Sequence, residues 1–321
     1  MPPFSIFKAI RQIFARKSNT KVKSNRPLRL VQLEDRRMLN ATFAFNGAAQ
    51  LDLAGFTNTT ATLTIGETGA APDAELTFTL NAGTWSGSDV VGSITGNGLS
   101  VLTVEKSLFA DNAADQLSIN INALIAGADN VNVLLGTDVT LPDSPIDGSL
   151  NITSDGTVTL GFAIDGAGND FSVDTTGAIS QTAALSNMGD LNYDAGTTID
   201  INASIATLGT VDIDASGLTT IGAAGDITSG GAVTFGAAKA GLLTTSGDID
   251  TTDDNITFNR AVTLGGDVDF DTTGTAAGNI HFASTIATAG NNLTLDAGSA
   301  GDIDLDAAAT GGGDLIVRDG A

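Results

Sequence analysis

The main pattern along the chain is a triplet in which two apolar residues flank one polar residue. Side chains alternate between the two faces of a strand, so each triplet predicts a short strand with one buried face. Gly, Asn, Asp and Ser fill the intervals, as tight turns require. In the first half of the chain the triplets begin at Leu51, Leu63, Leu76, Leu102, Leu117, Val131 and Leu150.

In the second half the triplets become regular enough to define a repeat, and toward its end they recur about every 12 residues. The second apolar position carries Phe235, Phe258, Phe270 and Phe282, so like residues recur at a full step of the repeat and at half a step. Stacked coils of about 22 to 25 residues would place Phe258 beneath Phe282 in a core, and not in a ligand-binding aromatic strip. These triplets begin at Leu191, Ile199, Val211, Val233, Ile256, Val268, Ile280, Leu293, Ile303 and Leu315.

Two architectures fit short strands at this spacing, an array of β-sandwiches or a parallel β-solenoid. No Pro occurs after Pro145, which is consistent with strands that are paired on both edges. We therefore predict an all-β chain folded as a right-handed parallel β-helix. A basic leader that is partly helical or disordered is expected to precede it.

The charge is divided unevenly along the chain. The total is −23, while ten Lys and Arg against Glu34 and Asp35 give residues 1–41 a charge of +8, which leaves −31 for residues 42–321. Residues 1–41 are therefore predicted to be a leader or targeting segment. Residues 42–147 are an irregular β region, interpreted as early coils or an N-terminal cap, with a separate small β domain as the alternative. Residues 148–321 hold the regular β-helix repeats.

The leader begins with a basic amphipathic segment. Apolar residues at positions 6, 7, 10, 13 and 14 follow helical spacing, and basic residues lie mostly off that stripe. A targeting segment that touches an anionic membrane surface has this pattern, and a frayed tail is the alternative. An ordinary secretory signal is not indicated, because charges interrupt the apolar residues.

A short motif, Leu33 to Ala41, closes the leader at the charge boundary. It reads Leu-Glu-Asp-Arg-Arg-Met-Leu-Asn-Ala. This segment resembles the N-terminal motif of planctomycete-type large surface proteins, which reads Leu-Glu-Pro-Arg, any residue, Leu-Leu. Asp35 stands in place of the proline and Met38 in place of the first leucine. The resemblance implies export to the cell surface and implies nothing about catalysis.

The repeats also resemble those of a second group of surface proteins. The segments 266–271 and 301–306 read Gly-Asp-Val-Asp-Phe-Asp and Gly-Asp-Ile-Asp-Leu-Asp. They are similar to repeats of filamentous-haemagglutinin and autotransporter passenger proteins, over about residues 148 to 321. That resemblance implies the same β-helix fold and a surface or adhesive role.

Composition excludes several classes of site and partner. The chain has no Cys, so disulfides, thiolate zinc sites and iron-sulfur clusters are excluded. His281 is the only His, which excludes the usual multi-histidine metal sites. The acidic body would repel the phosphates of nucleic acid, so no nucleic-acid partner is expected. No apolar run is long enough to predict a transmembrane span.

The Asp residues that alternate with apolar residues must point outward. We interpret them mainly as a solubilising surface that discourages edge-to-edge aggregation. Calcium is the alternative, because stacked carboxylates repel and oxygen ligands suit this ion. The candidate ligands are Asn169, Asp170, Asp302 and Asp304. No other cofactor is expected.

The sequence predicts no enzyme, and no catalytic or cofactor-binding residue is assigned. It contains no Gly-x-Ser-x-Gly, no Gly-x-x-x-x-Gly-Lys and no His-Glu-x-x-His. His281 lies between two core residues and is interpreted as a surface strand histidine. The enzymatic alternative is a polysaccharide lyase in which Arg260, near Asp253 and Asp254 in the sequence, would stabilise developing negative charge.

We therefore expect an exported structural or adhesin-like repeat protein at the cell surface or outside the cell. The alternatives are a polysaccharide-binding or polysaccharide-lyase-type β-helix and a calcium-binding surface-layer component. Surface polysaccharide and other envelope proteins are the expected partners. The C-terminal edge is expected to pair with further coils or with a partner.

Overall fold

The computed structural model describes a body built from β-strands. It describes residues 40–45, 50–56, 62–69, 75–81, 83–90, 93–105, 118–123, 132–135, 139–140, 149–239, 241–276 and 278–318. The chain divides into two units, Met1–Arg36 and Arg37–Ala321, and every described residue belongs to the second. The amphipathic segment and residues 33–39 of the motif lie outside the described residues.

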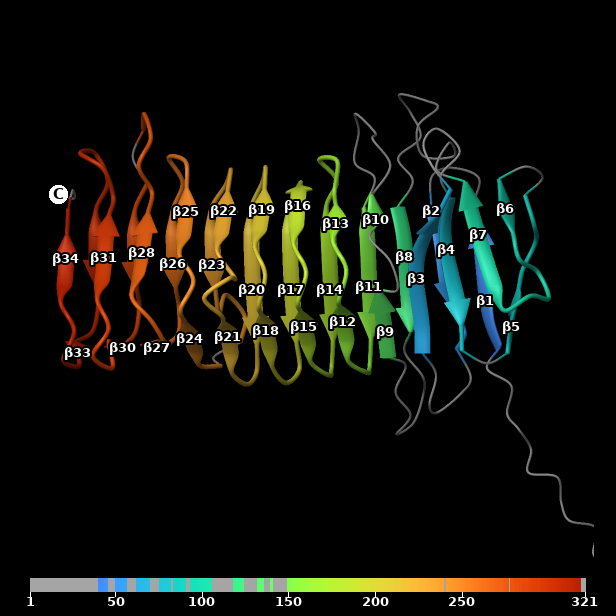
Figure 1. Cartoon of the computed structure of the whole chain (residues 1–321), viewed down its shortest axis with the longest axis horizontal. Helices are drawn as coiled ribbons and strands as arrows, with labels where there is room; N and C mark the ends of the chain where they lie inside the picture. The colour runs from blue at the N-terminus through green and yellow to red at the C-terminus, as the bar shows by residue number, and fades with distance from the viewer. Residues whose placement is uncertain are drawn as a thin grey trace, which may run out of the picture. The chain divides into compact units, whose positions relative to one another are not determined.

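The strands form three sheets, which we call sheets A, B and C (Figure 1). Sheet A has 12 strands and sheet C has 9. In spatial order, sheet A contains β5 (Thr84–Ser86), β1 (Asn40–Phe45), β2 (Gln50–Ala54), β8 (Ser118–Ala123), β11 (Leu150–Ser154), β14 (Phe171–Thr175), β17 (Leu191–Ala195), β20 (Val211–Ala215), β23 (Val233–Phe235), β26 (Ile256–Phe258), β29 (Ile280–Phe282) and β32 (Ile303–Leu305).

Sheet B is the largest, with 13 strands. In spatial order it contains β6 (Ile94–Thr95), β7 (Val101–Glu105), β4 (Glu75–Leu80), β3 (Thr62–Thr68), β9 (Asn132–Leu135), β12 (Val158–Leu160), β15 (Ile179–Gln181), β18 (Ile199–Ile201), β21 (Thr219–Ile221), β24 (Leu243–Thr245), β27 (Val262–Leu264), β30 (Ile286–Ala287) and β33 (Ala309–Thr310). Sheet C contains β10 (Val139–Thr140), β13 (Ile164–Asp165), β16 (Leu185–Met188), β19 (Ile205–Thr207), β22 (Ile227–Ser229), β25 (Ile249–Thr251), β28 (Val268–Asp271), β31 (Leu293–Asp296) and β34 (Leu315–Val317).

From β8 onward the chain visits sheets A, B and C in turn, so three strands make one coil. Each strand pairs in parallel with the strand of the same sheet in the next coil. Leu191 pairs with Val211 and Ile256 pairs with Ile280, so the length of a coil varies slightly along the stack. The described residues contain strands and no helix. The prediction of an all-β parallel β-helix is therefore confirmed.

Sequence reasoning recognised only two of the three strands in each of the later coils. Triplets beginning at residues 256, 280 and 303 belong to sheet A, and those at 268, 293 and 315 belong to sheet C. The strands of sheet B between them include β30 and β33, which are two residues long each. A two-residue strand has too few alternating positions to produce a triplet. Strand β27 does alternate, as Val262-Thr263-Leu264, and was missed although the triplet is present.

The strands that precede the coils change from parallel to antiparallel pairing. Strands β2 and β3 pair in parallel with β8 and β9, as an additional coil would. Antiparallel pairs then follow, β1 with β2, β3 with β4, β4 with β7 and β6 with β7, while β1 also pairs in parallel with β5. The predicted boundary at residue 148 stays a prediction, because residues 141–148 lie outside the described ones.

The core of the coils contains the predicted column of phenylalanines. The side chains of Phe235, Phe258 and Phe282 occupy paired positions of sheet A, and their ring centroids are 5.3 and 4.5 Å apart in nearly parallel planes. Phe270 approaches from sheet C, 5.0 Å from Phe258. All four rings are fully buried. The expectation that these residues form a core ladder is therefore confirmed.

The turns carry a second ladder, made of polar side chains. The Asp190 backbone N–H donates to Asp170 Oδ1 at 2.7 Å, and the Thr210 N–H donates to Asp190 Oδ1 at 2.6 Å. On the sheet C side, the Asp248 N–H donates to Asp226 Oδ1 at 3.0 Å. In each bond the earlier coil supplies the acceptor and the next coil supplies the donor. Many acidic residues therefore satisfy backbone groups in the turns.

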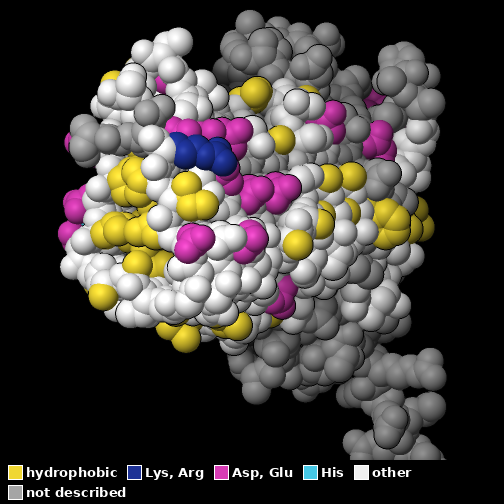
Figure 2. Space-filling view, turned by 60° about the vertical axis from the view of Figure 1, so that its left-hand side comes forward, with side chains coloured by type: hydrophobic (Ala, Val, Ile, Leu, Met, Phe, Trp, Pro, Cys, Tyr) yellow, Lys and Arg dark blue, Asp and Glu magenta, His cyan; other side chains and the backbone are white. Residues whose placement is uncertain are grey.

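The last described coil is the least buried. In β34, Leu315 and Ile316 are each 42% exposed and Val317 is 52% exposed. Figure 2, in which the C-terminal end comes forward, shows hydrophobic side chains close to acidic ones on this end of the unit. Among the described residues β34 pairs with β31 alone.

Candidate functional site

The first two sequence-predicted calcium ligands lie in the turn before β14, where Asn169 bonds within the turn and Asp170 joins it to the next coil. Asn169 is 2% exposed, and its side-chain amide donates to the Gly166 carbonyl at 2.8 Å. Asp170 accepts the Asp190 backbone N–H in the turn ladder at 2.7 Å. The structure gives both side chains a hydrogen-bonding role within the fold.

The other two predicted ligands, Asp302 and Asp304, flank Ile303 of β32. The Asp302 backbone N–H donates to Asn279 Oδ1 at 2.8 Å, and its carbonyl accepts the Ile280 N–H at 2.9 Å. Five strands of sheet A separate β14 from β32. The four predicted ligands therefore do not come together in one site.

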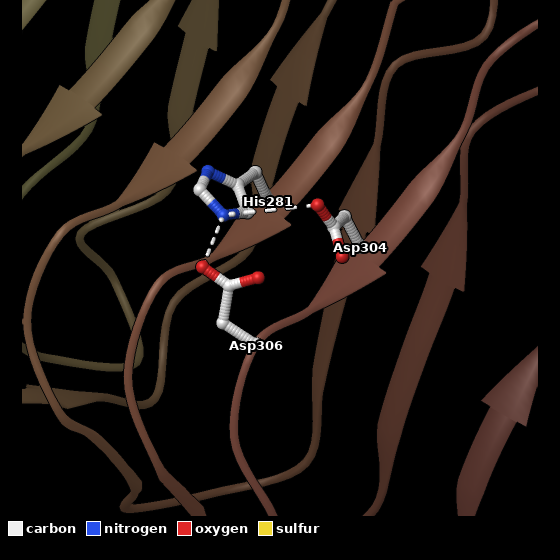
Figure 3. A group of neighbouring side chains, drawn as sticks. All are labelled: His281, Asp304 and Asp306. Atoms are coloured by element: carbon white, nitrogen blue, oxygen red, sulfur yellow. Dashed lines mark hydrogen bonds and ion pairs between the residues drawn. The ribbon is translucent and has the colours of Figure 1, made fainter.

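A different cluster forms on the outward face of sheet A. Strands β29 and β32 are neighbours, with His281 directly opposite Asp304. The His281 Nε2 atom lies 3.2 Å from Asp306 Oδ2 and 4.0 Å from Asp304 Oδ2. Ile280 and Phe282, on either side of the histidine, are fully buried. The imidazole is thus forced to the outer surface, where the two carboxylates meet it (Figure 3).

This cluster combines one imidazole with two carboxylates. One ligand atom from each of His281, Asp304 and Asp306 lies within 4.8 Å of the others. The side chains are 33%, 68% and 55% exposed, respectively. Solvent and dissolved ions therefore reach the cluster. An imidazole nitrogen with two carboxylate oxygens is a donor set that divalent transition ions accept.

Sequence reasoning placed His281 on the outer surface but missed the cluster. Its partner Asp304 lies one coil further along the chain, at the paired position of the next strand of sheet A. The spacing of one coil between His281 and Asp304 could therefore have indicated that they are neighbours. It could not be used without knowing that β29 and β32 share a sheet, because the length of a coil varies along the stack.

Arg260, the predicted cation of the lyase alternative, is buried. It is 2% exposed, and its Nη2 atom lies 3.1 Å from Asp214 Oδ1 and 3.2 Å from the Ile213 carbonyl oxygen. Its Nη1 atom donates to Thr219 Oγ1 at 3.1 Å. Burial away from water lowers the pKa of Arg260, while the Asp214 carboxylate acts in the opposite direction. The guanidinium therefore holds coils together and is not presented to a substrate.

The other described basic residues are also engaged. Lys239 forms an ion pair with Asp194 and donates to the Ala195 carbonyl at 3.1 Å. Arg318 lies 3.2 Å from Asp269. Lys106 lies outside the described residues. Within the part of the body that the structure describes, every Lys and Arg thus has an acidic partner.

A shallow hollow lies on the outer face of sheet A near its N-terminal end. It has a volume of about 390 Å³. A ladder of hydrogen bonds crosses it, from Asn120 Nδ2 to Asp52 Oδ1 at 3.2 Å and from Asn151 Nδ2 to Asn120 Oδ1 at 3.0 Å. Ser172 extends the ladder with a bond of 2.6 Å to Asn151. The hollow is lined by Asp52, Ala54, Asn120, Ile121, Asn151 and Thr153.

Comparison with known proteins gives no relative from which a function could be transferred. No family model, no curated protein and no solved structure matches the chain. Among the described residues, no helix is long and apolar enough to cross a membrane. The function of the chain is therefore inferred from its own residues and their geometry.

Proposed function

We propose that the protein is an exported structural or adhesive element of the cell surface and not an enzyme. The stack of parallel coils supports this proposal best. Backbone hydrogen bonds join each coil to the next across three sheets, and most inward positions are filled with apolar side chains. Such a stack gives a stiff, extended scaffold. A stiff scaffold with a polar exterior suits a spacer or a display surface.

The surface location rests on the leader and on the charge. The motif at residues 33–41 and the repeats resemble parts of surface proteins, and the body is strongly acidic. A high net charge of one sign keeps a protein soluble and discourages close association of its copies. Envelope proteins and surface polysaccharide are the partners that this proposal implies.

Fractionation of cells that produce the full chain tests the proposal. We expect the body in the envelope or extracellular fraction, digestible by protease added outside intact cells. The matched control is a double variant of the motif, Leu33→Ala with Arg36→Ala, which we expect to stay inside. Detection of the folded wild-type body only in the cytoplasm would contradict export.

Polysaccharide binding is a second candidate, favoured by the hollow on sheet A. Its lining combines amide, carboxylate and hydroxyl groups, which donate to and accept from the hydroxyls of a sugar chain. Calorimetric titration with neutral and amino-sugar polysaccharides tests it. We expect Asn151→Ala to weaken binding and Thr228→Ala, an exposed position on sheet C, to leave it unchanged. Equal binding by both variants would contradict a site in the hollow.

A further inference from the structure

We propose that His281, Asp304 and Asp306 bind a divalent transition ion of the zinc class on the outer face of sheet A. The three side chains converge from adjacent strands, and one ligand atom from each lies within 4.8 Å of the others. No step of the proposed surface function depends on this site.

The backbone fixes the positions of the three ligands. The Ile280 N–H donates to the Asp302 carbonyl at 2.9 Å, and the Asp306 N–H donates to the Phe282 carbonyl at 3.0 Å. These two bonds lie on either side of His281 and continue the ladder one residue beyond β32. The register between histidine and carboxylates is therefore set by the sheet before any ion arrives, so little ordering is required on binding.

The spacing fits a small ion after minor side-chain movement. Zinc binds imidazole nitrogen and carboxylate oxygen at about 2.0 to 2.2 Å, so two ligands of a tetrahedral ion lie about 3.4 Å apart. The two distances from His281 Nε2, 3.2 Å to Asp306 and 4.0 Å to Asp304, lie on either side of that value. Both carboxylates are more than half exposed and can rotate. Water would complete the coordination.

The charge balance also favours a cation. The described Lys and Arg side chains form their ion pairs with Asp194, Asp214 and Asp269. Within the described residues, the one basic partner of Asp304 and Asp306 is thus His281. The two carboxylates lie close to each other, and a divalent ion compensates both charges.

The imidazole ligand favours binding of zinc over binding of calcium. Calcium prefers oxygen ligands and six to eight of them, whereas imidazole suits zinc, copper and nickel. The cluster offers one nitrogen and two carboxylates, too few oxygen groups for a protein calcium site. We therefore expect zinc to bind and calcium at the same concentration to compete poorly.

The single histidine of the chain makes the test direct. In untagged, metal-free protein of the full sequence, one set of imidazole NMR signals belongs to His281. We expect added zinc to shift or broaden that set at one equivalent, and equimolar calcium to leave it in place. Unchanged imidazole signals in excess zinc would overturn the proposal without any variant.

Calorimetry with zinc chloride then assigns the carboxylates. We expect His281→Ala to abolish the zinc site and Asp306→Asn to weaken it at least tenfold. The matched control is Asp200→Asn, which removes one charge from the outer face of sheet B, and we expect wild-type affinity from it. Zinc affinity that is equal in all three variants would show a diffuse effect of acidic charge and overturn the site. Circular dichroism checks that each variant is folded.

Discussion

At the scale of single residues, the unusual feature is a group of aspartates and one arginine where two neighbouring strands of sheet A meet. Asp194, Asp212 and Asp214 lie on neighbouring strands of sheet A, and Asp214 is nearly buried with Arg260. The Asp212 Oδ1 atom is buried without a hydrogen-bond partner among the described residues. Burial first, and then the nearby Asp214 and Asp194 carboxylates, raise the pKa of Asp212 above its ordinary value.

This raised pKa predicts that Asp212→Asn stabilises the protein at neutral pH. A carboxyl whose pKa is higher in the folded state favours folding when protonated, and its ionisation costs stability as pH rises through the raised pKa. We expect the variant to melt at a higher temperature than wild type at pH 7. The difference should disappear below about pH 3.9, the ordinary pKa of Asp, where both states hold the proton.

Thermal melting of the two proteins at pH 7 and at pH 3 provides the measurement. Asp200→Asn serves as the control for loss of one negative charge, because Asp200 lies at a partly exposed, outward position of β18 between the buried Ile199 and Ile201. A lower melting temperature for Asp212→Asn at pH 7 would contradict the sign of the shift.

At the scale of the element, the coil is held by the phenylalanine column. Phe258 lies between Phe235 and Phe282, at 5.3 and 4.5 Å, and also contacts Phe270 from sheet C. It is therefore the ring with the most aromatic neighbours in the column. Removing it leaves a cavity that paired backbones on two sides prevent from collapsing.

We expect Phe258→Ala to lower the free energy of unfolding by about 3 to 5 kcal/mol, the usual cost of deleting a buried Phe. Urea denaturation followed by circular dichroism measures it. Phe162→Ala is the control, since Phe162 is 43% exposed, and its cost should stay below about 1 kcal/mol. Similar losses from both variants would mean that the column adds nothing to coil stability.

In the later coils the sequence predicted the strands of sheets A and C well and those of sheet B poorly. The Phe positions follow from the repeat, because a core ladder needs like residues one coil apart. Strand β30 holds only Ile286 and Ala287 and gave no signal. The His281 cluster depends on which strands become neighbours, and that pairing is fixed by loop lengths. Alternation alone therefore gave the outward side of His281 but not its partners.

At the scale of the whole unit, stability is expected to decline toward the last described coil. In a solenoid each coil contacts only its neighbours, so a coil with two neighbours is held more firmly than one with one. Strand β20 pairs on both edges, with β17 and β23, whereas β34 pairs with β31 alone among the described strands. The side chains of β34 are also exposed.

Hydrogen exchange measured by mass spectrometry tests this gradient. We expect backbone amides of β20 to exchange at least roughly tenfold more slowly than those of β34, since local opening costs less at an edge. Equal protection of both strands in the isolated full chain would indicate that β34 has a second partner, such as another copy.

The polar ladder of the turns favours folding of the coils in order from the N-terminal end. Its side-chain oxygens on a finished coil accept N–H groups that belong to the following coil, as between Asp170 and Asp190 and between Asp226 and Asp248. A chain leaves the ribosome N-terminus first during synthesis. Each completed turn thus presents ready-made docking points to the segment that emerges next, and the protein can assemble vectorially, one coil after another.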